Sequence, residues 1–333
     1  MTASGERGLD GPLVAGVDVG GTKTLVVVTD DQDRVLYEHA APTDRSSLVD
    51  QIAGLVDDAR RHVGQDIAAV GVAVPGHVDP GDGSVSMAVN LGITYLPLGS
   101  MLHHELGVPI FVEHDARAAA LWLSEQAVDG WTQAPPSIAF LAIGTGISAG
   151  VVLDGAVLRG DNSFAGEVGH VVADPAGVAC ACGLRGCLET IAAGPAIARQ
   201  VAEAIAAGRS TVMSPGASAA DVFRASSAGD EVALEIVDRV ADHLARAIRS
   251  LALTLGVKRV VIGGGVAAAG PALLEPIQAR IALECAASPL VAAALGDATV
   301  ELLSPTASPG ARGAAAIART RIGMREREGV GER

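Results

Sequence analysis

Near the start of the chain, apolar residues alternate with small and polar ones on both sides of a Gly20–Gly21 pair. Alternation of this kind, enriched in valine, predicts two β-strands joined by a tight turn, and residues 30–33 predict a second turn before a third strand. The same order returns over residues 136–160, around Gly144-Thr145-Gly146. We therefore predict a duplicated β-β-β unit, with one copy over residues 13–38 and one copy in a second lobe.

Helical spacing of apolar residues alternates with short buried strands in the rest of the chain. The longest helix is predicted over residues 231–255, where apolar residues recur at four-residue steps: Val232, Ile236, Val240, Leu244 and Ile248. The other predicted elements are helices over 47–63, 98–106, 116–126 and 271–281 and strands over 67–76, 108–115 and 257–263. Residues 77–97 are expected to be rich in loops.

The amino-acid composition bounds the size of the core and the kinds of partner that the surface suits. With 333 residues, 49% of them hydrophobic and 19% charged, the chain can bury a large core and is expected to form two lobes. A net charge of −14 opposes a nucleic-acid-binding surface. No signal-peptide pattern and no apolar run long enough to span a bilayer is visible, so we expect a cytoplasmic protein.

The first glycine turn is a candidate phosphate site. Backbone N–H groups of Gly20 and Gly21 can face a phosphate, and Thr22 and Lys23 add side-chain donors. Asp18 is placed to hold Mg²⁺ through water, because Mg²⁺ prefers few carboxylates and keeps much of its hydration. The spacing is not that of a Walker P-loop, and a plain β-hairpin explains the same residues equally well.

Asp115 ends a predicted strand and stands directly before a predicted helix. Active groups in α/β proteins are commonly placed at such a position. Considered alone, however, Asp115 is explained at least as well as a helix N-cap.

Three of the four cysteines, Cys180, Cys182 and Cys187, fall within eight positions, and His170 stands just upstream. Three thiolates and an imidazole suit a tetrahedral structural zinc, although the spacing is not that of common zinc fingers. The alternatives are buried free thiols or a disulfide, which would leave one cysteine over and needs an oxidising compartment. Glu167 and Glu189 bracket the cluster, and zinc bound to one nitrogen of His170 would fix the other. Taken singly, the glutamates could be solvated loop charges.

Over residues 13 to 320 the sequence resembles the ROK family of bacterial sugar kinases and repressors, whose fold is the two-lobed actin/hexokinase-type (ribonuclease-H-like) α/β fold. The motifs that carry the resemblance are DVGGTK (Asp18–Lys23), GTG (Gly144–Gly146), EVGH (Glu167–His170), CACGLRGCLE (Cys180–Glu189) and GGG (Gly263–Gly265).

The resemblance implies an ATP-dependent kinase acting on the 6-hydroxyl of a hexose, with Asp115 as general base. It implies sugar contacts from Asn90, Glu167, His170 and Glu189, and structural zinc bound by His170 and the three cysteines. The glycine turns at Gly20–Gly21 and Gly144–Gly146 would hold ATP phosphates, and Gly263, Gly264 and Gly265 would lie near adenosine. Related proteins are dimers or tetramers, so a homodimer or homotetramer is expected.

The sequence departs from the family pattern at His114, where family kinases usually carry Asn before the catalytic Asp. That Asn helps to hold ring hydroxyls around C3 and C4, so His114 is a candidate substrate contact that puts the sugar in question. A 3-amino-hexose such as kanosamine is the alternative to glucose. In the other interpretation, His114 does not contact the sugar directly and glucose is still bound. The second turn also continues with Ser148 and Ala149 in place of glycines.

The expected organisation is a flexible N-terminus (1–12), a small lobe with the catalytic Asp (13–125), a large lobe with the zinc loop (126–322) and a flexible C-terminus (323–333). The alternative function is a sugar-sensing transcriptional regulator. Family regulators carry an N-terminal DNA-binding domain for which no room is expected here. A catalytically dead remnant is disfavoured by the presence of Asp18, Asp115, Glu167 and Glu189. Whether the donor is ATP or polyphosphate stays open.

Overall fold

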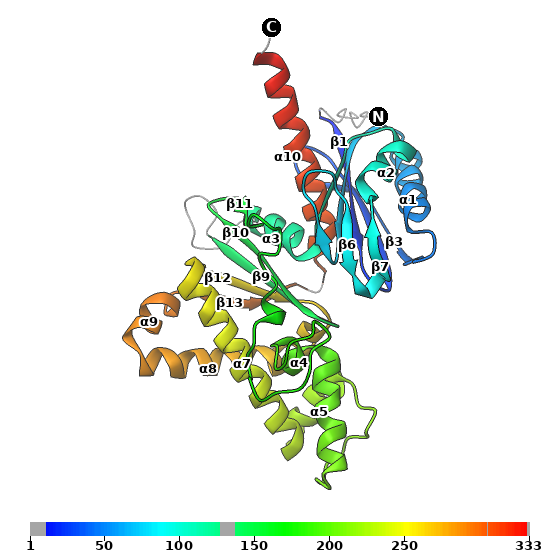
Figure 1. Ribbon diagram of the computed structural model, residues 1–333. Helices are drawn as coiled ribbons and strands as arrows, with labels where there is room; N and C mark the ends of the chain where they lie inside the picture. The colour runs from blue at the N-terminus through cyan, green and yellow to red at the C-terminus, as the bar shows by residue number, and fades with distance from the viewer. Residues whose placement is uncertain (1–10, 127–136, 305, 332–333) are drawn as a thin grey trace, which may run out of the picture. The chain divides into compact units, whose positions relative to one another are not determined.

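The computed structural model describes residues 11–126, 137–304 and 306–331 (Figure 1). The chain forms two compact units. Unit 1 comprises Met1–Leu123, Asp161–Ser163 and Ser308–Arg333, and unit 2 comprises Ser124–Gly160 and Phe164–Ala307.

Unit 1 is built on a five-stranded mixed sheet of order β3-β2-β1-β4-β8. β1 (Leu13–Val19) pairs antiparallel with β2 (Lys23–Thr29), which pairs antiparallel with β3 (Val35–Pro42). β4 (Ile67–Val74) runs parallel to β1, and β8 (Ile110–His114) runs parallel to β4. The predicted hairpin around Gly20–Gly21 and the predicted third strand are therefore confirmed.

Helices cover both faces of this sheet. Alternate strand residues such as Val17 and Val26 share a buried cluster with Ile52 of α1 (Leu48–Val63) and Leu102 of α2 (Leu98–Leu106). On the other face lie α3 (Asp115–Glu125) and α10 (Pro309–Gly331), whose Ala315 packs with residues of β1, β2 and β4. Because side chains alternate along a strand, each sheet face has its own apolar set.

The last helix returns to the first sheet. A Cβ on Gly16 of β1 would lie 1.9 Å from the carbonyl oxygen of Ala311, and one on Gly71 of β4 would lie 1.8 Å from that of Ala314. Only glycine at these two strand positions lets α10 approach so closely. Residues 308–322 thus pack in unit 1, whereas the sequence analysis assigned them to the second lobe, and α10 continues to Gly331 through the segment expected as a flexible C-terminus.

The expectation of loops over residues 77–97 was wrong in part. This segment forms a small antiparallel sheet of β5 (His77–Val78), β6 (Val85–Ala88) and β7 (Ile93–Leu96), with a 3₁₀ turn over Val89–Leu91. Strands of two to four residues are too short to give a clear alternation.

Unit 2 repeats the sheet of unit 1. Its strand order is β11-β10-β9-β12-β13, built from β9 (Ile138–Ile143), β10 (Ile147–Leu153), β11 (Ala156–Val157), β12 (Arg259–Gly263) and β13 (Thr299–Leu302). β9, β10 and β11 are antiparallel neighbours, while β9, β12 and β13 are parallel. Because the directions and the order match those of unit 1, the predicted duplication is confirmed.

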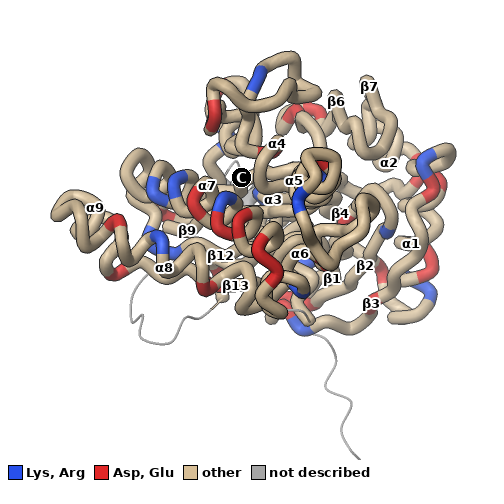
Figure 2. Tube along the Cα trace, turned by 90° about the horizontal axis from the view of Figure 1, so that it is seen from below, with Lys and Arg blue, Asp and Glu red and all other residues tan. Residues whose placement is uncertain are grey.

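Helices pack against the second sheet around one buried core. They are α4 (Glu189–Ala192), α5 (Gly194–Ala206), α6 (Ala219–Ser227), α7 (Glu231–Leu255), α8 (Pro271–Ala287) and α9 (Pro289–Leu295), with a 3₁₀ turn over Gly265–Ala269. The predicted stripe of α7 is buried as expected. Acidic and basic residues follow one another along α7 (Figure 2), where Arg246 pairs with Asp242.

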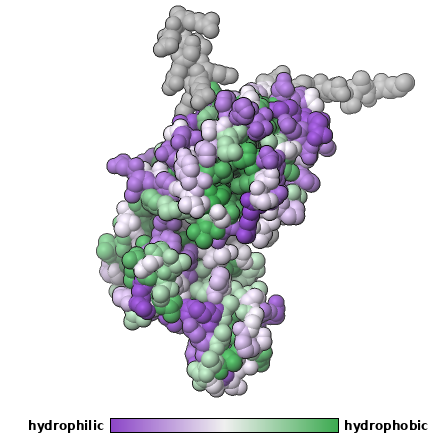
Figure 3. Space-filling view, turned by 45° about the vertical axis from the view of Figure 1, so that its right-hand side comes forward, coloured by the Kyte–Doolittle hydropathy of each residue, from purple (hydrophilic) through white to green (hydrophobic). Residues whose placement is uncertain are grey.

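The surface mixes hydrophilic residues with some hydrophobic ones (Figure 3). Among the described residues, no helix combines the length and the hydrophobicity that a membrane crossing requires.

Candidate active site

The turn after β1 presents free N–H groups. The N–H of Gly20 closes the turn by donating to the carbonyl oxygen of Lys23 at 2.9 Å. Within the described part of the chain, no acceptor takes the N–H of Gly21 or of Thr22. Two adjacent N–H groups without an acceptor thus lie beside a lysine, an arrangement that can bind an anion.

Asp18 lies at the end of β1, just before this turn. Burial first and the charge of Asp115 second raise the pKa of Asp18 to about 7, and the charge of Lys23 opposes this rise. The first turn of α10 lies against the same carboxylate, because a Cβ on Gly310 would come within 2.5 Å of Asp18 Oδ2. Two carboxylates and one ammonium group are therefore brought together in unit 1.

Asp115 is the first residue of α3, and its side chain is 37% exposed. Its Oδ1 accepts the N–H of Ala116 at 2.6 Å, the residue directly after it and not one deeper in the helix. Asp115 therefore contacts the start of its own helix through Oδ1. An N-cap side chain accepts an N–H two or three positions further on, so this contact is not an N-cap bond.

His114 is buried at the end of β8, with Nδ1 3.2 Å from Asp115 Oδ1. The N–H of Ala116 also donates to this Nδ1 at 3.3 Å, which is longer than its 2.6 Å bond to Asp115 Oδ1. Nδ1 of His114 therefore faces both the carboxylate of Asp115 and the backbone N–H of Ala116. The neighbouring Glu113 is held by Arg117 Nε at 2.7 Å and fixes the backbone N–H of His114.

Asn90 belongs to the 3₁₀ turn after β6. A Cβ built on Gly21 would lie 3.4 Å from the backbone oxygen of Asn90 and 3.6 Å from its Cβ. The predicted sugar-binding Asn thus lies beside the predicted phosphate turn.

The second and third glycine turns lie next to each other in unit 2. Gly144–Gly146 follow β9 and Gly263–Gly265 close β12, and these two strands are parallel neighbours. Among the described residues, none accepts the N–H of Thr145 or of Gly146. Turns at the carboxyl ends of adjacent parallel strands are common ligand positions.

Glu189 lies on the second glycine turn. Its Oε2 accepts the N–H of Ile147 at 3.1 Å, and a Cβ on Gly146 would lie 2.4 Å from the same oxygen. Glycine at 146 is therefore required for this carboxylate to approach the turn. The solvated-charge interpretation of Glu189 does not hold.

Glu167 precedes and His170 ends a 3₁₀ turn over Val168–His170, which packs on the start of β10. Cβ atoms on Gly166 and Gly169 would overlap the carbonyl oxygens of Ala149 and Ile147, at 1.9 and 2.1 Å. Glu167, His170 and Glu189 are consequently gathered around the first residues of one strand.

The four predicted zinc ligands form one cluster: the ligand atoms of His170, Cys180, Cys182 and Cys187 all lie within 4.8 Å of one another. The nitrogen in the cluster is Nδ1 of His170, 3.7 Å from Cys180 Sγ, and Cys182 Sγ lies 3.6 Å from Cys187 Sγ. The latter distance is far from the ~2.05 Å of a disulfide, and all three cysteines are free. Burial raises the pKa of Cys187 to about 12.

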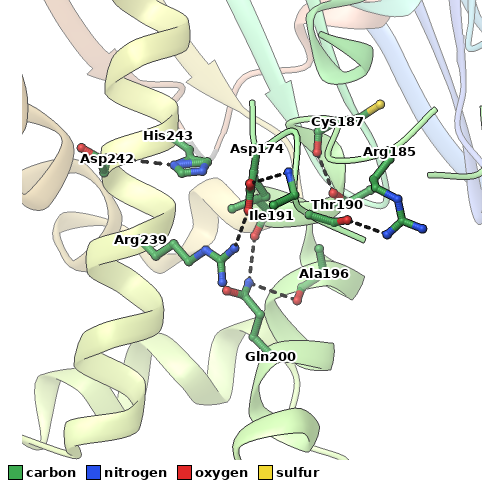
Figure 4. Close-up of polar contacts among 12 residues, drawn as sticks. Asp174, Arg185, Cys187, Thr190, Ile191, Ala196, Gln200, Arg239, Asp242 and His243 are labelled. Atoms are coloured by element: carbon green, nitrogen blue, oxygen red, sulfur yellow. Dashed lines mark hydrogen bonds and ion pairs between the residues drawn. The ribbon is translucent and has the colours of Figure 1, made fainter. Parts of the chain in front are cut away.

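The cysteine loop is anchored on the helices behind it (Figure 4). Asp174 binds Arg239 of α7 at 3.3 Å, and the carbonyl oxygen of Cys187 accepts the hydroxyl of Thr190 at 2.7 Å. Gln200 of α5 donates to the carbonyl oxygen of Ile191 at 2.9 Å. These bonds hold the segment that carries Glu189 and the last cysteine.

A pocket of about 300 Å³ opens beside Gly265. It is lined by α6, the 3₁₀ turn over Gly265–Ala269 and α8, and Phe223 and Arg224 are the largest of its lining side chains. The sequence analysis missed the residues of α6, because a helix with small residues on one face carries no motif.

A sequence model of the ROK family matches residues 14–321. This chain belongs to the ROK family. It is 34% identical over 278 residues to a glucokinase from Halalkalibacterium halodurans, covering 79% of this chain and 83% of that protein.

Two solved structures of the family show the same fold. The ROK hexokinase from Thermus thermophilus is 32% identical with a TM-score of 0.76, covering 93% of this chain and 99% of that one. A ROK glucokinase from Streptomyces griseus, solved with glucose and AMPPNP, is 28% identical with a TM-score of 0.73, covering 92% and 99%. The predicted family and the predicted hexokinase-type α/β fold are thus confirmed.

Proposed function

We propose that this ROK protein is an ATP-dependent kinase that transfers the γ-phosphoryl group of ATP to the 6-hydroxyl of a hexose. One observation carries the proposal: two carboxylates, Asp18 and Asp115, lie in unit 1 beside a glycine turn with unpaired N–H groups. Phosphoryl transfer needs mainly alignment and charge neutralisation, and these groups supply a base, a cation site and anion donors.

Asp115 would act as the general base. It accepts the proton of the 6-hydroxyl as the bond from that oxygen to the γ-phosphorus forms and the bond to the β-phosphate oxygen of the leaving ADP breaks. The unpaired N–H groups of Gly21, Thr22, Thr145 and Gly146 would hold phosphate oxygens. The pocket beside Gly265 would take the adenosine, for which its apolar lining is suited.

Asp18 is the residue that would hold Mg²⁺ through water. The ion would neutralise the phosphate charges, and its positive charge would favour the ionised form of Asp18 against the effect of burial.

The cysteine cluster fits a structural zinc. Ligands about 2.3 Å (sulfur) and about 2.0 Å (nitrogen) from a tetrahedral zinc lie about 3.5–3.8 Å from one another. The observed 3.6 and 3.7 Å match these values. Zinc on Nδ1 of His170 would leave Nε2 to bind a sugar hydroxyl together with the carboxylates of Glu167 and Glu189 and the amide of Asn90.

His114 bears on which hexose is bound. An imidazole is bulkier than the amide of the family's usual Asn, and it can either donate or accept a hydrogen bond, which suits an amine as well as a hydroxyl. A hexose modified at C3, such as kanosamine, is therefore proposed beside glucose.

The test is release of ADP from ATP and Mg²⁺, measured against a panel of hexoses and amino-hexoses, with polyphosphate as a second donor. At least one hexose should be phosphorylated at the 6-hydroxyl, as NMR of the product would show. A sugar-sensing regulator, the alternative function, would bind sugar without turnover. A homodimer or homotetramer stays a prediction, which sedimentation would check.

A further inference from the structure

The segment that joins β3 to α1 packs on the first glycine turn. Thr43 donates its hydroxyl to the carbonyl oxygen of Gly20 at 2.7 Å and its N–H to the carbonyl oxygen of Thr22 at 3.1 Å. Gln51 of α1 holds the same segment by donating to the carbonyl oxygen of Pro42. The segment is therefore fixed relative to the turn.

Arg45 extends from this segment over the turn. Its Nη2 donates to the carbonyl oxygen of Gly21 at 2.7 Å, and its Nε is 3.2 Å from the same oxygen. A guanidinium group has five N–H donors, so three remain. Arg45 is exposed, and in the described part of the chain no carboxylate lies within ion-pair distance of it.

The guanidinium is placed where the proposed reaction needs positive charge. The position of a Cβ on Gly21 would be 3.7 Å from Arg45 Nη2 and 3.6 Å from Asn90 Cβ. The cation thus shares one turn residue with a proposed sugar contact, and the unpaired N–H of that residue belongs to the proposed phosphate site.

The charges in unit 1 are compatible with a further cation besides Lys23 and the proposed Mg²⁺. Asp18 and Asp115 bring up to two negative charges, and Lys23 is the lysine whose charge acts on Asp18. A γ-phosphoryl group adds further negative charge. A planar guanidinium can bind two of its oxygens at once, which an ammonium cannot do in the same geometry.

We propose that Arg45 is a catalytic residue that binds the γ-phosphoryl group during its transfer. This inference rests on the proposed kinase function. Arg45 donates hydrogen bonds and moves no proton, so the reaction keeps the proton transfer to Asp115 and the departure of ADP described above.

A purely structural role of Arg45 would give a different pattern of variant effects on activity and nucleotide binding. If Arg45 only anchored the turn, its loss would act like the loss of the Thr43 hydroxyl, which also binds a turn carbonyl. Arg45→Gln keeps a side-chain donor for Gly21 but removes the charge, whereas Thr43→Val removes an anchor and no charge. Arg61→Gln is the matched control, since Arg61 is an exposed arginine of α1 paired with Asp58.

The experiment measures turnover and nucleotide binding for these variants. Arg45→Gln should lower kcat about 100-fold with an unchanged KM for the sugar, in the range found when one donor to a transition-state oxyanion is removed. It should weaken AMPPNP binding about 10-fold while leaving ADP binding unchanged. Arg45→Lys should recover less than a tenth of the lost kcat, and Arg61→Gln should match the wild type.

Two results would overturn the inference. One is a kcat for Arg45→Gln within threefold of the wild type, and the other is an equal loss of AMPPNP and ADP binding that Thr43→Val reproduces. If the wild type phosphorylates no hexose, the proposed function fails, and the comparison of AMPPNP with ADP still decides whether Arg45 binds the terminal phosphate.

Discussion

Replacing Asp18 with Asn should stabilise the protein in the absence of nucleotide and metal, although it removes a residue proposed for catalysis. The pKa of this carboxyl rises from 3.8 to about 7 on folding, mainly through burial and secondarily through Asp115. Between these two pH values the folded protein keeps a proton that the unfolded chain has released. Stability therefore falls as the pH rises from about 4 to about 7.

The magnitude follows from the pKa and from α10. At about 1.4 kcal/mol per pKa unit, the shift corresponds to about 4 kcal/mol at pH 8. The first turn of α10 lies on the carboxylate, and the partial positive charge of a helix N-terminus returns up to about 2 kcal/mol. We therefore expect Asp18→Asn to be more stable than the wild type by about 2 kcal/mol at pH 8 and equal to it at pH 4.

The assay is urea denaturation of the metal-free protein between pH 4 and pH 8, with Asp66→Asn as control, since Asp66 is an exposed carboxylate before β4. The control should follow the wild type at every pH. If Asp18→Asn is less stable than the wild type at pH 8, or if the difference does not grow with pH, the carboxylate is not destabilised by burial and the reasoning fails.

Three further outcomes are expected. The protein should carry about one zinc per chain by elemental analysis. Cys182→Ser should lose the metal and bind sugar more weakly, because His170 loses its orientation. Active protein without metal would contradict this. Asp115→Asn should keep its fold, as circular dichroism would show, and its sugar affinity. Its kcat should fall about 10²–10⁴-fold, the usual contribution of a general base. A lower melting temperature at an unchanged rate would leave only the N-cap role. His114→Asn should shift the ratio of kcat/KM between a 3-amino-hexose and glucose toward glucose, and an unchanged ratio would show that His114 does not select the sugar.

The sequence was sufficient for elements whose signals are local. The hairpins around Gly20 and Gly144 follow from alternation and a glycine turn, and the stripe of α7 follows from its spacing. The place of α10 could not be predicted in the same way. Its alanines show no strong amphipathic pattern, and the glycine that receives it, Gly16, lies about 300 residues earlier in the chain.

The site shows the same division. Motif residues such as Glu189 and the cysteine cluster were found because their residue types and spacing are specific. Arg45 is a single arginine in a polar segment, and Phe223 is one aromatic residue on a short helix. Arg45 contacts the first glycine turn, and Phe223 lines a pocket with the third glycine turn. These neighbours are distant in sequence and come together only in the folded chain.

The return of α10 to the first sheet also sets an order of assembly. During synthesis, β1 and β4 leave the ribosome early, yet the helix that covers one of their faces is made last. Until it arrives, Val14 and Ala69 face solvent or a substitute partner, while unit 2 can already close its own core. The half of the protein that is translated first is thus the half that is finished last, and in the nascent chain it is the half most exposed to misassembly.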